Sequence, residues 1–208
     1  MIKQDKYWGA AAAYMVGDNG DESNENQVTV SSNRIYFYSE VTRPECLSLN
    51  KSLQEIGNSM VSTAQTYGVP PPPVRIHINS YGGSVFAGLS SVDCILSSQA
   101  PVHSIVEGCA ASAATLMSVV ASERYIRENS YMLIHQLSSG MWGKYEELKD
   151  DMKNSDTLMA RIKGIYEKHA KIPKKELAEI LKHDLWFDAK TCLKYGLVDD
   201  ILTGGGNE

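Results

Sequence analysis

The alternation of strand-like and helix-like segments restricts the fold of this sequence more than any other feature. Four short segments rich in β-branched and apolar residues read as strands, at residues 74–79, 102–107, 124–127 and 131–135. Helical segments follow the first two of these strands, from Ser84 and from Ser112. Parallel strands in one sheet need helical crossovers between them. The alternation therefore predicts an α/β fold with a mostly parallel sheet.

Two longer segments with helical spacing of their apolar residues flank this region. Residues 47–67 follow a predicted strand over 35–41, and Gly68 is expected to end that helix. Residues 144–170 combine one apolar stripe with many charges, which predicts a long amphipathic helix. The C-terminal part is expected to hold a helix that starts near Pro173, a short helix capped by Asp188 and a last strand over 197–202.

The composition is that of one globular domain. Of the 208 residues 43% are hydrophobic and 22% are charged. We expect an N-terminal arm over residues 1–28 and a folded domain over 29–208. The net charge of −5 and the lack of a basic run argue against nucleic acid as a partner, and no apolar run is long enough for a membrane span. The four cysteines are far apart in sequence, which indicates reduced thiols in a cytoplasm and no metal site.

A turn with two glycines follows the predicted strand over residues 74–79. Gly82 and Gly83 stand where the backbone must turn toward the helix from Ser84. Such a turn exposes peptide N–H groups, which suit either a phosphate cradle or an oxyanion donor. The chain has neither of the glycine-rich signatures of nucleotide-binding loops. A plain strand-to-helix connection is the structural alternative.

Three polar residues are candidates for acyl chemistry. Ser112 opens a helix of small residues, where the N–H of Ala113 faces the same space, although it could simply cap that helix. His135 ends an apolar strand and is the best-placed base among the five histidines. Asp184 precedes the apolar run 185–187, so it could be partly buried and orient an imidazole, or be an exposed loop carboxylate.

Four motifs occur in the order and near spacing of one family. They are Ile78-Asn79-Ser80-x-Gly82-Gly83, Ala110-Ala111-Ser112-Ala113, Ile134-His135-Gln136 and Tyr195-Gly196-Leu197-Val198-Asp199. From about residue 33 to residue 203 the chain resembles the proteolytic subunit of the Clp protease, the ClpP family. The resemblance implies the ClpP/crotonase-like α/β fold, a spiral of β-β-α units with a projecting long handle helix.

The resemblance also implies a serine endopeptidase that needs no cofactor. Ser112 would be the nucleophile, His135 the general base and then acid, and Asp184 the group that orients the imidazole. Gly83 and Ala113 would form the oxyanion hole. Residues 138–143 would belong to a strand that pairs with an extended polypeptide substrate. The residues expected to bind the substrate are Gly82, Ser138, Ser139, Gly140 and Gly143.

The family resemblance implies a homo-oligomer of heptameric rings stacked as a tetradecamer, in the cytoplasm of a bacterium, a plastid or a phage-infected host. An AAA+ Clp ATPase would dock on an apolar cleft. In this chain polar residues occupy positions of that cleft, which argues against such docking: Arg75, His77, Glu107 and Arg127.

Two further interpretations keep the fold and change the function. The motifs Val85-Phe86-Ala87-Gly88 and Val106-Glu107-Gly108 are similar to those of prohead-maturation proteases, which favours a capsid-maturation or ATPase-independent protease. A crotonase-like acyl-CoA-binding protein or an inactive scaffold would use the same turns only for binding.

Overall fold

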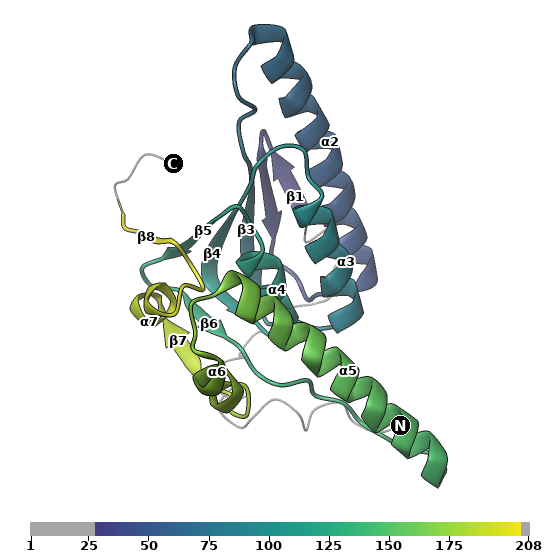
Figure 1. Ribbon diagram of the computed structural model, residues 1–208. Helices are drawn as coiled ribbons and strands as arrows, with labels where there is room; N and C mark the ends of the chain where they lie inside the picture. The colour runs from purple at the N-terminus through teal and green to yellow at the C-terminus, as the bar shows by residue number, and fades with distance from the viewer. Residues whose placement is uncertain (1–27, 205–208) are drawn as a thin grey trace, which may run out of the picture.

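The computed structural model describes residues 28–204, which form one mixed sheet with helices packed around it (Figure 1). The strand order is β1-β2-β3-β4-β5-β8, with β6 beside β4 and β7 beside β6. All neighbouring strands run parallel except the pairs β1–β2 and β6–β7. The strands are β1 (Val28–Ser31), β2 (Arg34–Phe37), β3 (Val74–Ser80), β4 (Val102–Ala111), β5 (Glu123–Arg127), β6 (Tyr131–Leu133), β7 (Trp186–Asp188) and β8 (Asp200–Leu202).

Six helices complete the described part of the chain. They are α2 (Arg43–Tyr67), α3 (Val85–Leu96), α4 (Ala113–Val119), α5 (Tyr145–His169), α6 (Lys174–Ile180) and α7 (Ala189–Lys194). Helix α2 packs against β1, β2 and β3, and α3 packs against α2 and α4. The N-terminal half of α5 extends beyond the rest of the body, while its C-terminal half contacts α4 (Figure 1). Within residues 28–204 no helix is both long enough and apolar enough to cross a bilayer.

The ends of α2 show how local signals set the helices. Gly68 ends the helix in the left-handed conformation with φ 66°, as predicted. The helix begins at Arg43, four residues before the predicted start. Thr42 accepts a hydrogen bond from the backbone N–H of Glu45, and Pro44 fits the first turn. The apolar spacing missed this first turn because the Thr42 cap and Pro44 set its start, and neither belongs to an apolar repeat.

Strand β4 is longer than predicted and is bent. The sequence predicted a strand over 102–107, and the structure extends it to Ala111. Residues 102–106 of β4 pair with β3, and 103–106 pair with β5. Gly108 has a φ of 73°, and after it residues 109–111 pair with β6. The bend redirects the end of β4 toward β6, which brings residues 112 and 133 together.

Several strands begin or end at other residues than predicted, because hydrogen bonding to a neighbouring strand determines where a strand ends. The strand predicted over 131–135 ends at Leu133, and the last strand begins at Asp200 instead of residue 197. Strands β1 and β7 were not predicted. The expected N-terminal arm lies outside the described residues except for Val28, which starts β1 and is buried.

Candidate active site

Ser112 lies in a strained turn between β4 and α4. Its φ and ψ are 53° and −124°, and it is one of two described non-glycine residues with positive φ. Such a conformation costs about 1–3 kcal/mol and is typical of functional sites. The backbone N–H of Ser112 donates to the carbonyl of Leu133 at 2.9 Å, which ties the turn to β6. The side chain makes no capping hydrogen bond to α4 and lines a cavity, so capping is not its role.

The Gly82-Gly83 turn packs closely against Ser112 and Val41 because neither glycine has a side chain. Gly82 has a φ of 97°, and a Cβ atom there would lie 2.7 Å from the Cβ of Ser112. A Cβ at Gly83, with φ 146°, would lie 2.6 Å from the carbonyl oxygen of Val41. Gly82 is buried and does not line the cavity, whereas Gly83 does. The structure therefore gives Gly82 a packing role under Ser112, where the sequence predicted contact with substrate.

The backbone of Gly83 faces the cavity for a reason of strand geometry. Val41 bridges to Gly83 in parallel fashion: Val41 N–H donates to the Gly82 carbonyl at 2.7 Å, and Ser84 N–H donates to the Val41 carbonyl at 2.8 Å. In this pattern the N–H and C=O of Gly83 point away from Val41. Ala113 is the first residue of α4, so its N–H has no partner within the helix. Both N–H groups are thus available beside Ser112.

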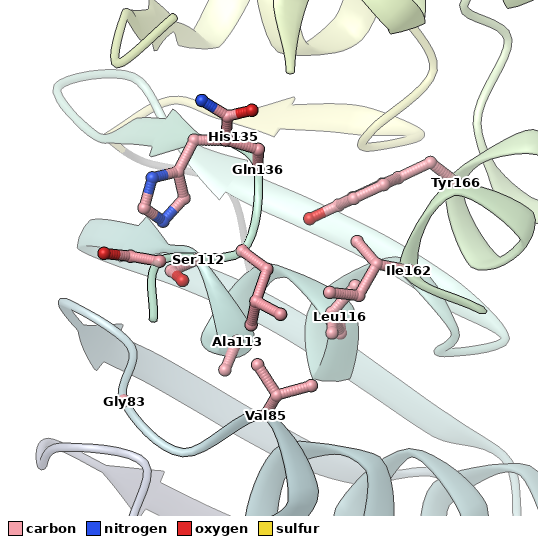
Figure 2. Close-up of a pocket in the computed structure, with 11 residues that line it drawn as sticks. Gly83, Val85, Ser112, Ala113, Leu116, His135, Gln136, Ile162 and Tyr166 are labelled. Carbon is pink, nitrogen blue, oxygen red and sulfur yellow. The ribbon is translucent and has the colours of Figure 1, made fainter. Parts of the chain in front are cut away.

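The imidazole of His135 lies between Ser112 and Asp184. His135 Nδ1 is 2.8 Å from Asp184 Oδ1, and in Figure 2 the other ring nitrogen faces Ser112. The His135 side chain is 19% exposed and that of Asp184 is 62% exposed. Of the two possibilities for Asp184, the single chain has the exposed loop carboxylate, because the adjacent Leu185 also faces solvent, with 61% exposure, and does not cover it.

A cavity of about 170 Å³ opens beside Ser112. Its polar edge includes Ser112, His135 and Ser138, and its walls are mostly apolar. Figure 2 shows apolar side chains from α3, α4 and α5 gathered on the side away from His135. The wall residues are Val85, Leu116, Leu137, Ile162 and Tyr166. A side chain of a bound polypeptide could occupy this space next to the serine hydroxyl.

The segment expected to pair with substrate has no strand partner within residues 28–204. No strand is assigned over 138–143, although a strand was predicted from the resemblance. Ser138, Ser139, Gly140 and Gly143 are exposed, and Ser138 lines the cavity. A strand is defined by its hydrogen-bonded neighbour, and no described residue supplies one here.

Three of the four polar residues expected in the docking cleft form one bonded cluster. Glu107 Oε1 lies 3.0 Å from His77 Nδ1 and 3.2 Å from Arg127 Nε, and Glu107 Oε2 accepts from Tyr38 Oη at 2.6 Å. Burial would raise the pKa of Glu107, but the bonds from Tyr38, His77 and Arg127 outweigh it and lower that pKa. The other residue, Arg75, faces His103 on β4.

Sequence reasoning missed two residues that support the nucleophile. Thr115 Oγ1 donates to the carbonyl oxygen of Ser112 at 2.6 Å, and the Tyr166 hydroxyl is 2.6 Å from the same Thr115 oxygen. Thr115 stood within a run of small residues, and Tyr166 was interpreted only as part of an apolar stripe. Neither position carries a local signal, because 51 residues separate the two partners.

Comparisons with known proteins show which family this chain is similar to. The ATP-dependent Clp protease proteolytic subunit of Deinococcus radiodurans is 33% identical over 135 residues, which cover 64% of this chain and 66% of that protein. Proteolytic subunit 2 of Treponema denticola is 34% identical over 131 residues, which cover 62% of this chain and 66% of that protein. The chain thus matches just under two thirds of the length of these curated relatives.

A solved structure of a ClpP1 mutant from Listeria monocytogenes shares the fold, with a TM-score of 0.72 at 21% identity. That match covers 84% of this chain and 93% of the other. The sequence model of the Clp protease family matches residues 51–205, which is most of the chain. The matched region includes the Gly82-Gly83 turn, Ser112, His135 and Asp184. The chain is therefore a member of the Clp protease family.

Proposed function

We propose that this chain is a serine endopeptidase that cleaves extended or unfolded polypeptides. The observation that carries the proposal is the convergence of three residues from distant parts of the sequence. Asp184 holds Nδ1 of His135, and the other ring nitrogen faces Ser112 at the edge of an apolar cavity. This arrangement suits nucleophilic acyl transfer, because a serine hydroxyl needs an adjacent base and the base needs an orienting group.

The proposed reaction uses only side chains and backbone of this chain. With Nδ1–H bonded to Asp184, Nε2 of His135 is free to accept the proton of Ser112 Oγ. The serine oxygen then attacks the scissile carbonyl, and the N–H groups of Gly83 and Ala113 stabilise the oxyanion. His135 next protonates the leaving amine, and water hydrolyses the acyl-enzyme by the same route. Each oxyanion donor is expected to contribute about 3 kcal/mol to transition-state stabilisation.

The exposed segment 138–143 supports binding of an extended substrate. Its backbone has no strand partner within residues 28–204, and Gly140 has open space around its Cα. An extended polypeptide would add as a strand here and place one side chain in the cavity. Backbone pairing gives affinity with little demand on sequence. The substrate is therefore expected to be an unfolded chain rather than a folded protein.

Ring assembly is part of the proposal. The start of α5 and the turn before it expose large apolar side chains, namely Trp142, Tyr145 and Met152. Trp142 is 98% exposed, which favours contact with another copy of the chain. A tetradecamer of two heptameric rings would weigh about 320 kDa, from 22.9 kDa per chain. Native mass spectrometry measures this directly, and a species near 23 kDa alone would contradict the assembly.

The polar cluster on the sheet favours a second candidate, an ATPase-independent or capsid-maturation protease. Tyr38, His77 and Arg127 all bond to Glu107, so the Glu107 carboxylate already has its partners within the cluster. Inserting an apolar loop from a Clp ATPase would break these bonds and desolvate the Glu107 carboxylate. Hydrolysis of an unfolded protein in the presence and absence of such an ATPase distinguishes the candidates. Stimulation by the ATPase would contradict the second one.

Active-site labelling tests the proposal. A fluorophosphonate probe should label the wild-type protein on Ser112, and Ser112→Ala should abolish both labelling and peptide hydrolysis. Labelling at another residue, or none in the assembled wild-type protein, would contradict a peptidase. Tight binding of an acyl-CoA thioester without labelling would instead support the crotonase-like alternative.

A further inference from the structure

A buried chain of hydroxyl groups connects α5 to the carbonyl of the candidate nucleophile. The carbonyl oxygen of Ser112 accepts from Thr115 Oγ1 at 2.6 Å and from the Thr115 backbone N–H at 3.0 Å. Thr115 Oγ1 is also 2.6 Å from the hydroxyl of Tyr166. Thr115 and Tyr166 are both buried, with 0% and 2% exposure. In Figure 2 the Tyr166 side chain projects away from α5, and its hydroxyl group is at the far end.

The chemistry of the groups fixes the direction of these bonds. A carbonyl oxygen can only accept, so the single hydroxyl proton of Thr115 goes to Ser112. The bond between Thr115 and Tyr166 must then use the proton of Tyr166. Burial raises the pKa of Tyr166, which keeps that proton in place throughout the neutral range. The chain therefore runs from Tyr166 through Thr115 to the Ser112 carbonyl.

The Ser112 carbonyl shares a peptide group with the proposed oxyanion donor. The C=O of Ser112 and the N–H of Ala113 belong to one planar trans peptide and point in opposite directions. Hydrogen bonds that fix the carbonyl on its buried side therefore fix the N–H on the cavity side. Ser112 combines a φ of 53° with a ψ of −124°, and because ψ sets the orientation of this peptide group, the group is held in an unfavoured conformation and needs such support. Bonds in series also polarise one another, which strengthens the N–H as a donor.

We propose that Thr115 and Tyr166 are positioning residues of the candidate peptidase, whose hydroxyls aim the Ala113 N–H at the developing oxyanion. The inference rests on the proposed peptidase function and adds to it a device that links α5 to the reacting atoms. A positioning role and a purely structural role predict different effects on kcat and KM. An oxyanion donor acts mainly in the transition state, so its misalignment lowers kcat while KM stays nearly constant.

Three single variants test the proposal by peptide hydrolysis, with kcat expressed per Ser112 titrated by a fluorophosphonate. Thr115→Val keeps the shape of the side chain and removes its hydroxyl, and it should lower kcat by about tenfold with KM within about twofold. Tyr166→Phe leaves the Thr115 bond to the carbonyl in place, so its effect should be smaller, about threefold. Thr115→Ser retains the hydroxyl and should restore kcat to near the wild-type value.

The double variant Thr115→Val/Tyr166→Phe provides the decisive control. Because both hydroxyls act through one carbonyl, the double variant should be no slower than Thr115→Val alone. Additive losses, a change confined to KM, or an unchanged kcat in Thr115→Val would overturn the proposal. If total activity falls only because fewer serines are titrated, Thr115 and Tyr166 act on stability alone, which also overturns the proposal. If Thr115→Val does not assemble, the kcat values of Tyr166→Phe and Thr115→Ser decide between the same two roles. An unlabelled wild-type protein would refute the peptidase function itself, a result distinct from these.

Discussion

The two halves of the candidate site are held in different ways. The nucleophile half is built into the core: Ser112 follows a central strand, Gly82 fits beneath it, and Thr115 fixes its carbonyl. The base half lies at the surface, where His135 follows a short strand and Asp184 is 62% exposed. One chain alone therefore determines the serine and the oxyanion groups firmly. It leaves the imidazole and its carboxylate more open to solvent.

The single chain is enough to position the nucleophile half, whereas the base half would be stabilised further by assembly. A charge-assisted bond from an exposed carboxylate competes with water and is weaker than a buried one. Residues 138–143, which follow His135, also have no strand partner within the described part of the chain. A second copy or a bound substrate that covered this side would strengthen the His135–Asp184 bond. The base half is thus where the activity of this chain is expected to depend on assembly.

The largest effect is expected from the base half. Asp184→Asn keeps the shape of the side chain but removes its charge, which favours the wrong imidazole tautomer. We expect kcat to fall by about 10³–10⁴-fold, as for the corresponding change in a serine protease triad. Thermal stability should stay nearly constant because the side chain is exposed. Peptide hydrolysis and thermal unfolding measure the two effects.

The matched control for this variant is Glu179→Gln, which changes an exposed carboxylate of α6 that bonds to Lys182. It should leave hydrolysis unchanged within about twofold. A loss of less than tenfold in Asp184→Asn would mean that another group orients His135.

An intermediate effect is expected from the packing beneath the nucleophile. Gly82→Ala places a Cβ atom 2.7 Å from both the Ala111 carbonyl oxygen and the Ser112 Cβ, at a φ of 97°. The variant should lose about 3 kcal/mol of unfolding free energy and about 100-fold in the rate of fluorophosphonate labelling, because the Ser112 turn must shift. Gly164→Ala is the control, since a Cβ at this position in the C-terminal half of α5 meets nothing within 4 Å. Equal unfolding free energies and equal labelling rates for the two variants would show that the turn beneath Ser112 can adjust to a Cβ atom.

The smallest effect on activity is expected from the anchor of α5. Arg124 bonds to Asp199 and to the carbonyls of His169 and Gly196, which joins the end of α5 to β5 and the C-terminal segment. Arg124→Met should lower the unfolding free energy by about 2 kcal/mol, less than for a fully buried pair because Asp199 is 41% exposed. Activity per titrated serine should change by about twofold at most, since Arg124 and its partners do not line the cavity beside Ser112.

The same pair predicts a dependence of stability on pH. The hydrogen bond and charge of Arg124 lower the pKa of Asp199 below its usual value of 3.8. A lowered folded-state pKa stabilises the protein above the unfolded-state value, and this contribution disappears as the pH falls through the folded-state pKa. The wild-type urea midpoint should therefore decrease below about pH 4. The urea midpoint of the Arg124→Met variant should decrease less over that pH range. Parallel plots of urea midpoint against pH for the two proteins would contradict a stabilising Arg124–Asp199 pair.

The sequence predicted the nucleophile half better than the base half, for physical reasons. Gly82 and Gly83 are informative because a positive φ beside a strand end favours glycine at those positions. The strain at Ser112 has no comparable signal, because a serine adopts it only when pairing with β6 requires it. The apolar neighbours of Asp184 left partial burial and exposure open, because burial depends on what packs over a loop, and no segment within residues 28–204 covers this side chain.

For the fold as well, features set by local contacts were predictable from the sequence, and features set by long-range contacts were not. Gly68, Ser84 and Asp188 mark helix ends through bonds to residues a few positions away, and all three are helix caps in the structure. Strand β7 has three residues and exists only because it pairs with β6 across more than 50 positions. No local pattern contains that information. The α/β class was predictable from alternation, whereas the edge strands β1 and β7 were not.

The most direct test of the central claim is whether Ser112 and His135 act on one bound molecule. A peptidyl chloromethyl ketone forms a hemiketal with an active serine and alkylates the adjacent histidine, and peptide mapping by mass spectrometry locates the alkylated residue. We expect alkylation on His135 alone among the five histidines, with a large decrease in its rate in Ser112→Ala. Alkylation spread over several histidines, or a rate at His135 that does not depend on Ser112, would contradict the account.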